Sequence, residues 1–225
     1  MTILTLGDSF TFGAELQDVP SELTLTGQHK WDYQNLQSIP VDPSKFAWPS
    51  LLGARFNQEV EDMAVVGGSN SRIFRRAVAS GIKKNYDLII CAWTSISRLD
   101  ISHQGQECVI TARTPVWPWA KTFFADHFEY NQEIEKWLAQ VLALQSFFKT
   151  RNQKYIFVNA INNNVIPEYN YLVQHIDKEF YLDWNSGFQA WCEHSPRGSG
   201  GHFLEQGHQL VANTLENFIK QKNLL

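Results

Sequence analysis

The sequence predicts an α/β protein in which helices cover both faces of a parallel sheet of about five strands. Three observations lead to this prediction. Short apolar runs typical of buried strands alternate along the chain with longer segments of helical period. The run over residues 87–93 is almost continuously apolar, as in a central parallel strand that is buried on both faces. No repeat, low-complexity segment or linker divides the 225 residues, so one domain over 1–225 is expected.

The first strand is predicted over residues 1–6, because the apolar run from Ile3 to Leu6 stops abruptly at Gly7. Trp48-Pro49 then begins a helix that continues to about residue 57, with its large apolar side chains on one side.

The next three elements follow the same alternation. Residues 59–65 are predicted as a second strand that ends before Gly67-Gly68. A helix over residues 69–84 follows, with either Ser69 or Asn70 as its cap. The buried strand over residues 87–93 comes next.

The second half of the chain contains the clearest helix. Over residues 133–151, apolar side chains recur at steps of three and four. Residues 155–160 form another buried strand, residues 179–183 a short last strand, and residues 204–220 the closing helix.

Two long stretches, at about 14–47 and 101–131, show no clean period and are interpreted as insertions in the domain. The second is irregular and carries Trp117 and Trp119 between and beside prolines. Long loops in compact domains are commonly functional. We therefore expect both insertions to lie over the C-terminal ends of the strands and to wall a pocket.

Composition narrows the class of protein. Charged residues make up 19% and hydrophobic residues 44%, which is a globular composition. A net charge of −4 argues against a general nucleic-acid binder, which would show a basic face. No signal peptide or membrane-spanning segment is visible, and the three cysteines are widely spaced, as in a reducing compartment. The expectation is a soluble cytoplasmic protein without nucleic-acid or membrane partners.

Ser9 lies close after the first strand, where a catalytic group is expected. Ligands of open α/β sheets bind at the C-terminal ends of the strands. A serine hydroxyl needs a base to become a useful nucleophile, and His202 in Gly200-Gly201-His202 is the candidate. His208 is expected on another face of the closing helix, as a packing residue. No zinc-ligand spacing or phosphate-binding glycine loop occurs, so no metal or cofactor is expected.

Three blocks in this order resemble those of the GDSL/SGNH hydrolase family. They are Gly7-Asp8-Ser9-Phe10 followed by Gly13, then Ala64-Val65-Val66-Gly67-Gly68-Ser69-Asn70, and finally His202 followed by Gly207-His208. The resemblance covers residues 1 to about 218. It implies a flavodoxin-like three-layer α/β/α sandwich in which Ser9 attacks an ester and His202 moves the proton.

The resemblance also implies an oxyanion hole made by the amides of Ser9 and Gly67. A residue without Cβ lets its amide approach the substrate closely. The family's third block normally supplies an asparagine, but residues 91–98 read Cys-Ala-Trp-Thr-Ser-Ile-Ser-Arg. Ser95, or Thr94 if the register differs by one, is expected to donate its hydroxyl instead.

The last block departs from the family as well. The family places an aspartate three residues before its histidine, and Ser199 occupies that position. A carbonyl, a hydroxyl or a distant carboxylate must then orient His202, with Asp183 and Glu193 as candidates. The resemblance therefore implies a Ser-His dyad and leaves the acid open.

Together these residues predict a serine esterase that acts on a small ester, for example an acylated carbohydrate. Asn70, Arg98, Trp117 and Trp119 are candidate substrate-binding residues, and Arg98 could instead pair with Asp100. Two alternatives stay open. One is a catalytically degenerate protein of the same fold that binds or supports structure, and the other is an acyltransferase with the same serine chemistry.

Overall fold

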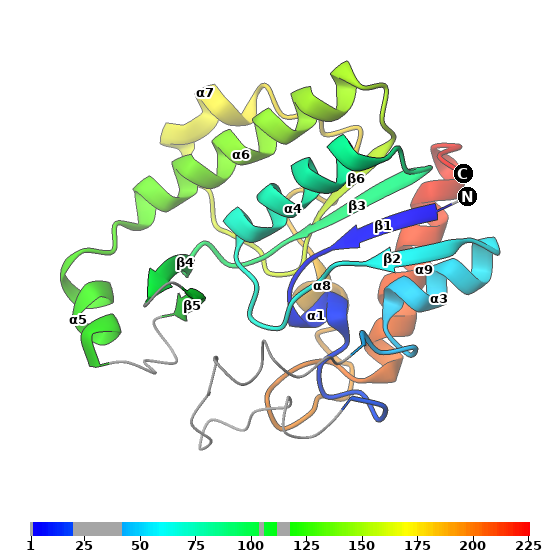
Figure 1. The fold of residues 1–225 in the computed structure, drawn as a ribbon, viewed down its shortest axis with the longest axis horizontal. Coiled ribbons are helices and arrows are strands. Elements are labelled where there is room, and N and C mark those ends of the chain that lie inside the picture. Colours follow the sequence, from blue (N-terminus) through cyan, green and yellow to red (C-terminus); the bar gives the residue numbers. More distant parts are fainter. Residues whose placement is uncertain (1, 20–41, 104–105, 112–117) are drawn as a thin grey trace.

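A computed structural model describes residues 2–19, 42–103, 106–111 and 118–225 (Figure 1). Its centre is a sheet of five parallel strands in the order β2-β1-β3-β6-β7. The strands are β1 (Thr2–Leu6), β2 (Glu59–Asp62), β3 (Leu88–Trp93), β6 (Tyr155–Asn159) and β7 (Tyr181–Leu182). Counted within the sheet alone, this is the 2-1-3-4-5 order of flavodoxin-like folds. The predicted parallel sheet of about five strands is confirmed.

Helices form a layer on each face of the sheet (Figure 1). One layer contains α4 (Asn70–Lys83), α6 (Tyr130–Thr150) and the short α7 (Asn170–Val173). The other contains α3 (Trp48–Phe56), α8 (Phe188–Trp191) and α9 (Glu205–Gln221). The result is the three-layer α/β/α sandwich that the sequence predicts.

The strand β3 contains only apolar residues because both of its faces are buried. Its side chains alternate between two cores: Ile89, Cys91 and Trp93 pack beneath α4 and α6, and Leu88, Ile90 and Ala92 beneath α3 and α9. All six residues are buried, so either face of the strand requires an apolar side chain.

Of the two residues predicted as the possible cap of this helix, Ser69 and Asn70, the cap is Ser69. Its side-chain oxygen accepts a hydrogen bond from the amide of Arg72 at 3.1 Å, so Ser69 caps α4 and Asn70 is the first helical residue. Within the described residues, no helix combines the length and apolar character needed to cross a membrane.

The prediction that residues 101–131 are irregular is wrong for the described part. β4 (Arg98–His103) and β5 (Gln106–Thr111) form an antiparallel hairpin, and α5 (Pro118–Asp126) is a helix. A two-stranded hairpin pairs locally and does not need the continuous apolar run that marks a central strand. It follows directly after the C-terminal end of β3 and lies away from the main sheet (Figure 1). Trp117 lies outside the described residues.

Most of the first insertion, residues 20–41, also lies outside the described residues. Its two described ends are held together by Asp18. The Ser44 hydroxyl donates to Oδ1 of Asp18 at 2.5 Å, and the Lys45 amide donates to Oδ2 at 2.9 Å.

Candidate active site

Ser9 begins α1 (Ser9–Phe12), a single helical turn that follows β1 at once. Asp8 caps this turn by accepting a hydrogen bond from the amide of Phe10 at 3.0 Å. Gly7 allows the abrupt change of direction, because a Cβ at this position would lie 2.0 Å from Oγ1 of Thr11. The turn therefore holds Ser9 at the C-terminal end of β1, where the sequence placed a catalytic group.

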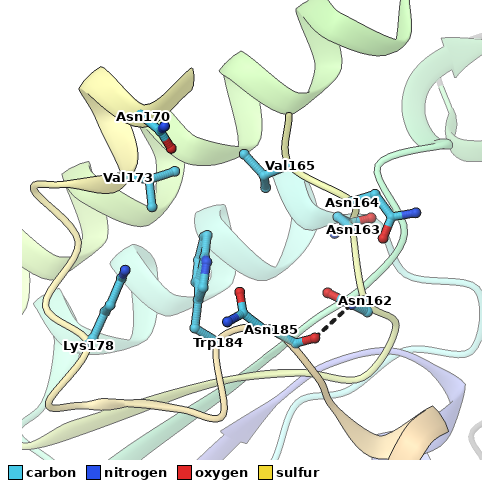
Figure 2. A pocket seen from close by; sticks show the side chains of 9 residues that line it. All are labelled: Asn162, Asn163, Asn164, Val165, Asn170, Val173, Lys178, Trp184 and Asn185. Atoms are coloured by element: carbon cyan, nitrogen blue, oxygen red, sulfur yellow. Dashed lines mark hydrogen bonds between the residues drawn. The ribbon is translucent and has the colours of Figure 1, made fainter. Parts of the chain in front are cut away.

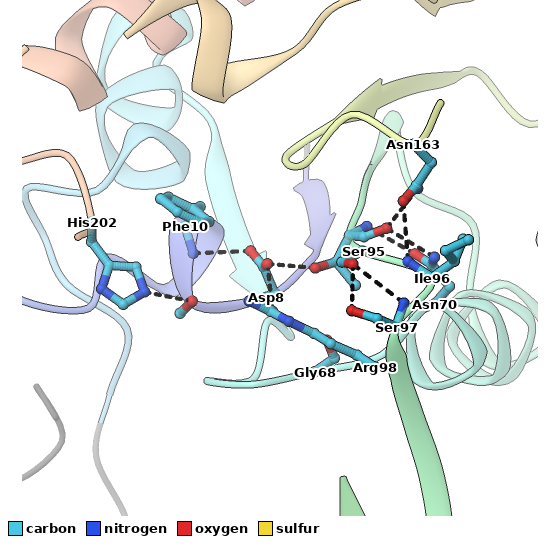
Figure 3. A network of polar contacts seen from close by, with 12 residues as sticks. Asp8, Phe10, Gly68, Asn70, Ser95, Ile96, Ser97, Arg98, Asn163 and His202 are labelled. Carbon is cyan, nitrogen blue, oxygen red and sulfur yellow. Dashed lines mark hydrogen bonds and ion pairs between the residues drawn. The ribbon is translucent and has the colours of Figure 1, made fainter. Parts of the chain in front are cut away.

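His202 lies next to Ser9, although 193 positions separate the two residues. Its Nε2 atom is 2.8 Å from the Ser9 Oγ atom (Figure 3). The ring of Phe10 packs against the imidazole, with the ring centroids 4.8 Å apart. The structure thus brings together the serine and the histidine that the sequence analysis paired.

The other imidazole nitrogen faces a carboxylate that sequence reasoning missed. Nδ1 of His202 is 2.9 Å from Oε2 of Glu15, whose side chain is only 4% exposed. The backbone amides of Gly200 and His202 donate to the same carboxylate at 2.6 and 3.0 Å, and the Ser199 hydroxyl donates at 3.2 Å. Ser9, His202 and Glu15 therefore form one hydrogen-bonded series.

The environment of Glu15 favours its charged form. Burial raises the pKa of this carboxyl, but the hydrogen bonds from Gly200 and His202 and the nearby imidazole outweigh burial and hold the pKa below its ordinary value. The backbone φ of Glu15 is 70°, a left-handed conformation that residues with a Cβ seldom adopt. This strained position is consistent with a functional role, because such strain persists only where surrounding contacts compensate for it.

A glycine-rich hairpin encloses the carboxylate. Arg197 and Phe203 pair across its base, and the Gly198 amide donates to the carbonyl of His202 at 2.8 Å. A Cβ at Gly198 would lie 2.6 Å from the Glu15 carboxyl group, and one at Gly200 would lie 3.0 Å from it. Larger residues at either position would therefore displace Glu15.

Asp183 and Glu193, the two acids predicted from the sequence as candidates for this role, do not contact His202. Asp183 accepts a hydrogen bond from the indole of Trp191 at 2.8 Å, and Glu193 is exposed. Glu15 was missed because it belongs to the aperiodic stretch after the Ser9 block. Its signal in the sequence was indirect: a Cβ at Gly198 or Gly200 would press on the Glu15 carboxyl group, so both positions favour glycine.

Gly67 lies in the turn after β2 and has a φ of 76°, which glycine adopts without strain. The Val65 amide donates to the carbonyl of Gly7 at 3.2 Å, so this turn lies against the one that carries Ser9. Among the described residues, the Gly67 amide has no hydrogen-bond acceptor. It is therefore available to a ligand.

The hydroxyls of Thr94 and Ser95 have different partners. The Thr94 hydroxyl donates to Oδ2 of Asp8 at 2.7 Å. The Ser95 oxygen lies 2.8 Å from the hydroxyl of Ser97 and also accepts from the Ser97 amide at 3.2 Å. In Figure 3, Asp8 lies between Ser95 and His202. Both hydroxyls therefore have partners within the protein: Thr94 contacts Asp8, and Ser95 contacts Ser97.

Asn70 holds the segment after β3 in place. Its side-chain amide donates to the carbonyl of Thr94 at 2.9 Å and accepts from the Thr94 amide at 2.8 Å. Asn163 also donates to this carbonyl, at 2.8 Å, and accepts from the amide of Ile96 at 3.1 Å. Asn70 is buried and both ends of its amide are used, so its observed contacts are structural.

The expected pairing of Arg98 with Asp100 is wrong. Nη1 of Arg98 lies 2.7 Å from Oδ2 of Asp8, and Asp100 pairs with Arg72 and Arg75 at 3.6 and 2.9 Å. The Asp8 side chain is fully buried, and a buried carboxylate requires a compensating cation. Arg98 supplies that cation beside Ser9.

Neither Trp119 nor His208 forms a described contact with Ser9. Trp119 is 40% exposed on α5. His208 is buried in α9, where its Nδ1 accepts a hydrogen bond from the Trp48 amide at 3.2 Å. Burial lowers the pKa of His208 to about 3, so the ring is neutral. The interpretation of His208 as a packing residue agrees with these contacts.

The fold is that of a known class of α/β/α proteins. No family model and no curated protein sequence matches the chain. Among solved structures, the psychrotrophic esterase EstA from Pseudoalteromonas sp. is similar, with a TM-score of 0.55, 13% identity, and coverage of 98% of this chain and 97% of that one. A G-D-S-L family protein from Desulfitobacterium hafniense has a TM-score of 0.51 and 11% identity, over 96% and 98% of the two chains.

An acetyl xylan esterase, AlAXEase, is also similar, with a TM-score of 0.50 and 13% identity over 96% of this chain and 98% of that one. At such low identity the shared property is the fold. The resemblance to GDSL/SGNH hydrolases that the three sequence blocks indicated is therefore confirmed at the level of the fold.

Proposed function

We propose that this protein is a serine esterase that hydrolyses small esters through an acyl-enzyme formed on Ser9. The observation that carries the proposal is the series Ser9 Oγ, His202 Nε2, His202 Nδ1 and Glu15 Oε2, with hydrogen-bond distances of 2.8 and 2.9 Å. The esterases that share the fold support the same reaction class.

The three side chains have distinct roles in this mechanism. The Glu15 carboxylate can only accept a hydrogen bond, so it favours the tautomer that carries a proton on Nδ1 of His202. Nε2 is then the acceptor for the Ser9 hydroxyl proton. As Ser9 Oγ attacks the ester carbonyl carbon, Nε2 takes this proton, and Glu15 stabilises the imidazolium that forms.

Two proton transfers complete the turnover. His202 gives the proton on Nε2 to the leaving alkoxide, which departs as the alcohol and leaves the acyl group on Ser9. Water then attacks the acyl carbon while His202 accepts its proton, and the acid is released as Ser9 regains its hydrogen.

The negative oxygen of each tetrahedral intermediate needs donors that are already in place. We assign the amides of Ser9 and Gly67 and the hydroxyl of Ser95 to this role. Two observations support the assignment of the Ser9 and Gly67 amides. The Gly67 amide is free, and the turn that contains it lies against the turn that carries Ser9, through the hydrogen bond from the Val65 amide to the Gly7 carbonyl. Asp8, Arg98 and Thr94 brace the turn that carries the nucleophile.

The proposed substrate is an acyl ester of a polar molecule such as a carbohydrate, in line with the acetyl xylan esterase that shares the fold. A catalytically degenerate protein becomes the weaker alternative. The missing family aspartate favoured that alternative, but the Glu15 carboxylate contacts His202 in its place.

Hydrolysis of p-nitrophenyl acetate tests the proposal. The wild-type protein should release p-nitrophenolate, and Ser9→Ala should remove this activity. Ser146→Ala, at an exposed serine in α6, is the matched control and should hydrolyse the ester at the wild-type rate. Activity that survives in Ser9→Ala would refute the assignment of the nucleophile.

A further inference from the structure

A second feature at the same edge of the sheet has no role in the mechanism above. It is a pocket of about 350 Å³ that opens beyond the C-terminal ends of β6 and β7 (Figure 2). Its size is at the lower end of the range for small-molecule sites. Five asparagines line it: Asn162, Asn163, Asn164, Asn170 and Asn185.

The chemistry of the lining is unusual. Besides the asparagines, the pocket presents Lys178, Trp184 and two valines, and no carboxylate. Each asparagine amide offers both hydrogen-bond donors and an acceptor. Among the described residues, the side chains of Asn164, Asn170, Asn185 and Lys178 have no hydrogen-bond or ion-pair partner. These polar groups are therefore available to a ligand.

Three of the residues that line the pocket are held in place by contacts within the protein. Asn163 is held by Thr94 and Ile96, and Asn162 donates to the carbonyl of Asn185 at 3.0 Å (Figure 2). Trp184 stacks in parallel on the buried Trp137, with ring centroids 5.6 Å apart and an angle of 3° between the planes. The pocket is thus formed before any ligand arrives, which lowers the entropic cost of binding.

We propose that this pocket binds the saccharide part of the ester. Sugar hydroxyls both donate and accept hydrogen bonds, as the asparagine amides do. Trp184 adds an apolar surface between these polar groups. A long acyl chain fits poorly here, because it would cover the amides and leave them without partners.

The position of the pocket relative to Ser9 suits this role. β3 is the single strand between β1 and β6, so the ends of these two strands are roughly 10 Å apart. Asn163, on the pocket wall, contacts Thr94, and Thr94 contacts Asp8 next to Ser9. A saccharide in the pocket could therefore extend toward the nucleophile. The link between this pocket and ester cleavage rests on the proposed function. The binding of a sugar in the pocket does not depend on the proposed function.

Calorimetric titration with xylotriose, mannotriose and cellotriose tests the proposal, because these sugars contain no ester and bind without turnover. At least one should bind the wild-type protein and Ser9→Ala alike. Asn185→Leu and Asn170→Leu, which add apolar bulk to opposite walls, should each weaken binding at least about tenfold. Asn213→Leu, at an exposed position in α9, is the matched control and should bind like the wild type.

Three outcomes would overturn the proposal: no trisaccharide binds the wild type, binding is unchanged in both pocket variants, or Asn213→Leu weakens it equally. Thermal unfolding checks that each variant is folded. If one of the two pocket variants does not fold, the other is compared with the wild type and with Asn213→Leu. Failure of the esterase proposal has a different result. Ester turnover would then be absent while a trisaccharide still binds in the pocket.

Discussion

The carboxylate of Glu15 lies 2.9 Å from Nδ1 of His202, although 187 positions separate the two residues in the sequence. The family position for this acid holds Ser199, whose hydroxyl donates to the same carboxylate. An acid from the segment after the nucleophile thus occupies the place that an aspartate near the histidine would fill. Glu15 should therefore be needed for catalysis, and a second carboxylate at position 199 should interfere with it.

Replacing Glu15 with glutamine should lower kcat for p-nitrophenyl acetate by about 10²–10⁴, since an amide neither fixes the Nδ1–H tautomer nor stabilises the imidazolium. KM should change little. Glu193→Gln, at an exposed acid, is the control and should keep the wild-type kcat. Steady-state kinetics measures both. A Glu15→Gln enzyme with wild-type kcat would show that Glu15 does not assist His202.

Restoring the family aspartate should impair the enzyme. The Ser199 hydroxyl lies 3.2 Å from Oε1 of Glu15, so Ser199→Asp would bring a second carboxylate against the first. We expect kcat to fall. The double variant Glu15→Gln with Ser199→Asp should be more active than Glu15→Gln alone, because the new acid then meets no like charge. A rise in kcat for Ser199→Asp alone would contradict this account.

Removing the cation beside Asp8 should destabilise the fold. Arg98→Met leaves the fully buried Asp8 carboxylate without its ion pair, which typically costs about 3–5 kcal/mol of unfolding free energy. Lys84→Met is the control, because its ion pair with Glu61 joins side chains that are 48% and 39% exposed, and such pairs contribute about 1 kcal/mol or less. Urea denaturation measures both. Equal losses would mean that burial of Asp8 does not matter.

Asp62 should make stability depend on pH. Burial raises the pKa of this carboxyl from 3.8 to about 7. The folded state therefore holds a proton that the unfolded state has already lost, and stability should decline as pH rises from about 4 to about 7. Asp62→Asn removes the titrating group and should flatten this part of the profile. Urea denaturation at several pH values measures the difference, and parallel profiles for the two proteins would refute the prediction.

The sheet could be predicted because its signals are local. β3 must be apolar on both faces, and α6 repeats its buried side chains at helical spacing, so each pattern is complete within one element. Gly7 and Ser9 were visible for the same reason. The turn that they build is set by residues that lie within a few positions of one another.

Glu15 and Arg98 could not be assigned in this way, because their roles depend on partners far along the chain. Glu15 acts on a hairpin that lies 185 positions away, measured at Gly200, and nothing in its own neighbourhood marks that contact. Arg98 has an acid two residues later, yet it pairs with Asp8 because Asp8 is buried and needs a cation. Tertiary burial decided both pairings.

The central claim is that His202 and Glu15 activate Ser9. Intact-protein mass spectrometry after exposure to a fluorophosphonate probe tests it most directly. We predict one adduct, mapped by peptide digestion to Ser9, that is absent in Ser9→Ala and forms far more slowly in His202→Ala and Glu15→Gln. A folded wild-type protein that remains unlabelled, or is labelled at a residue other than Ser9, would contradict the claim.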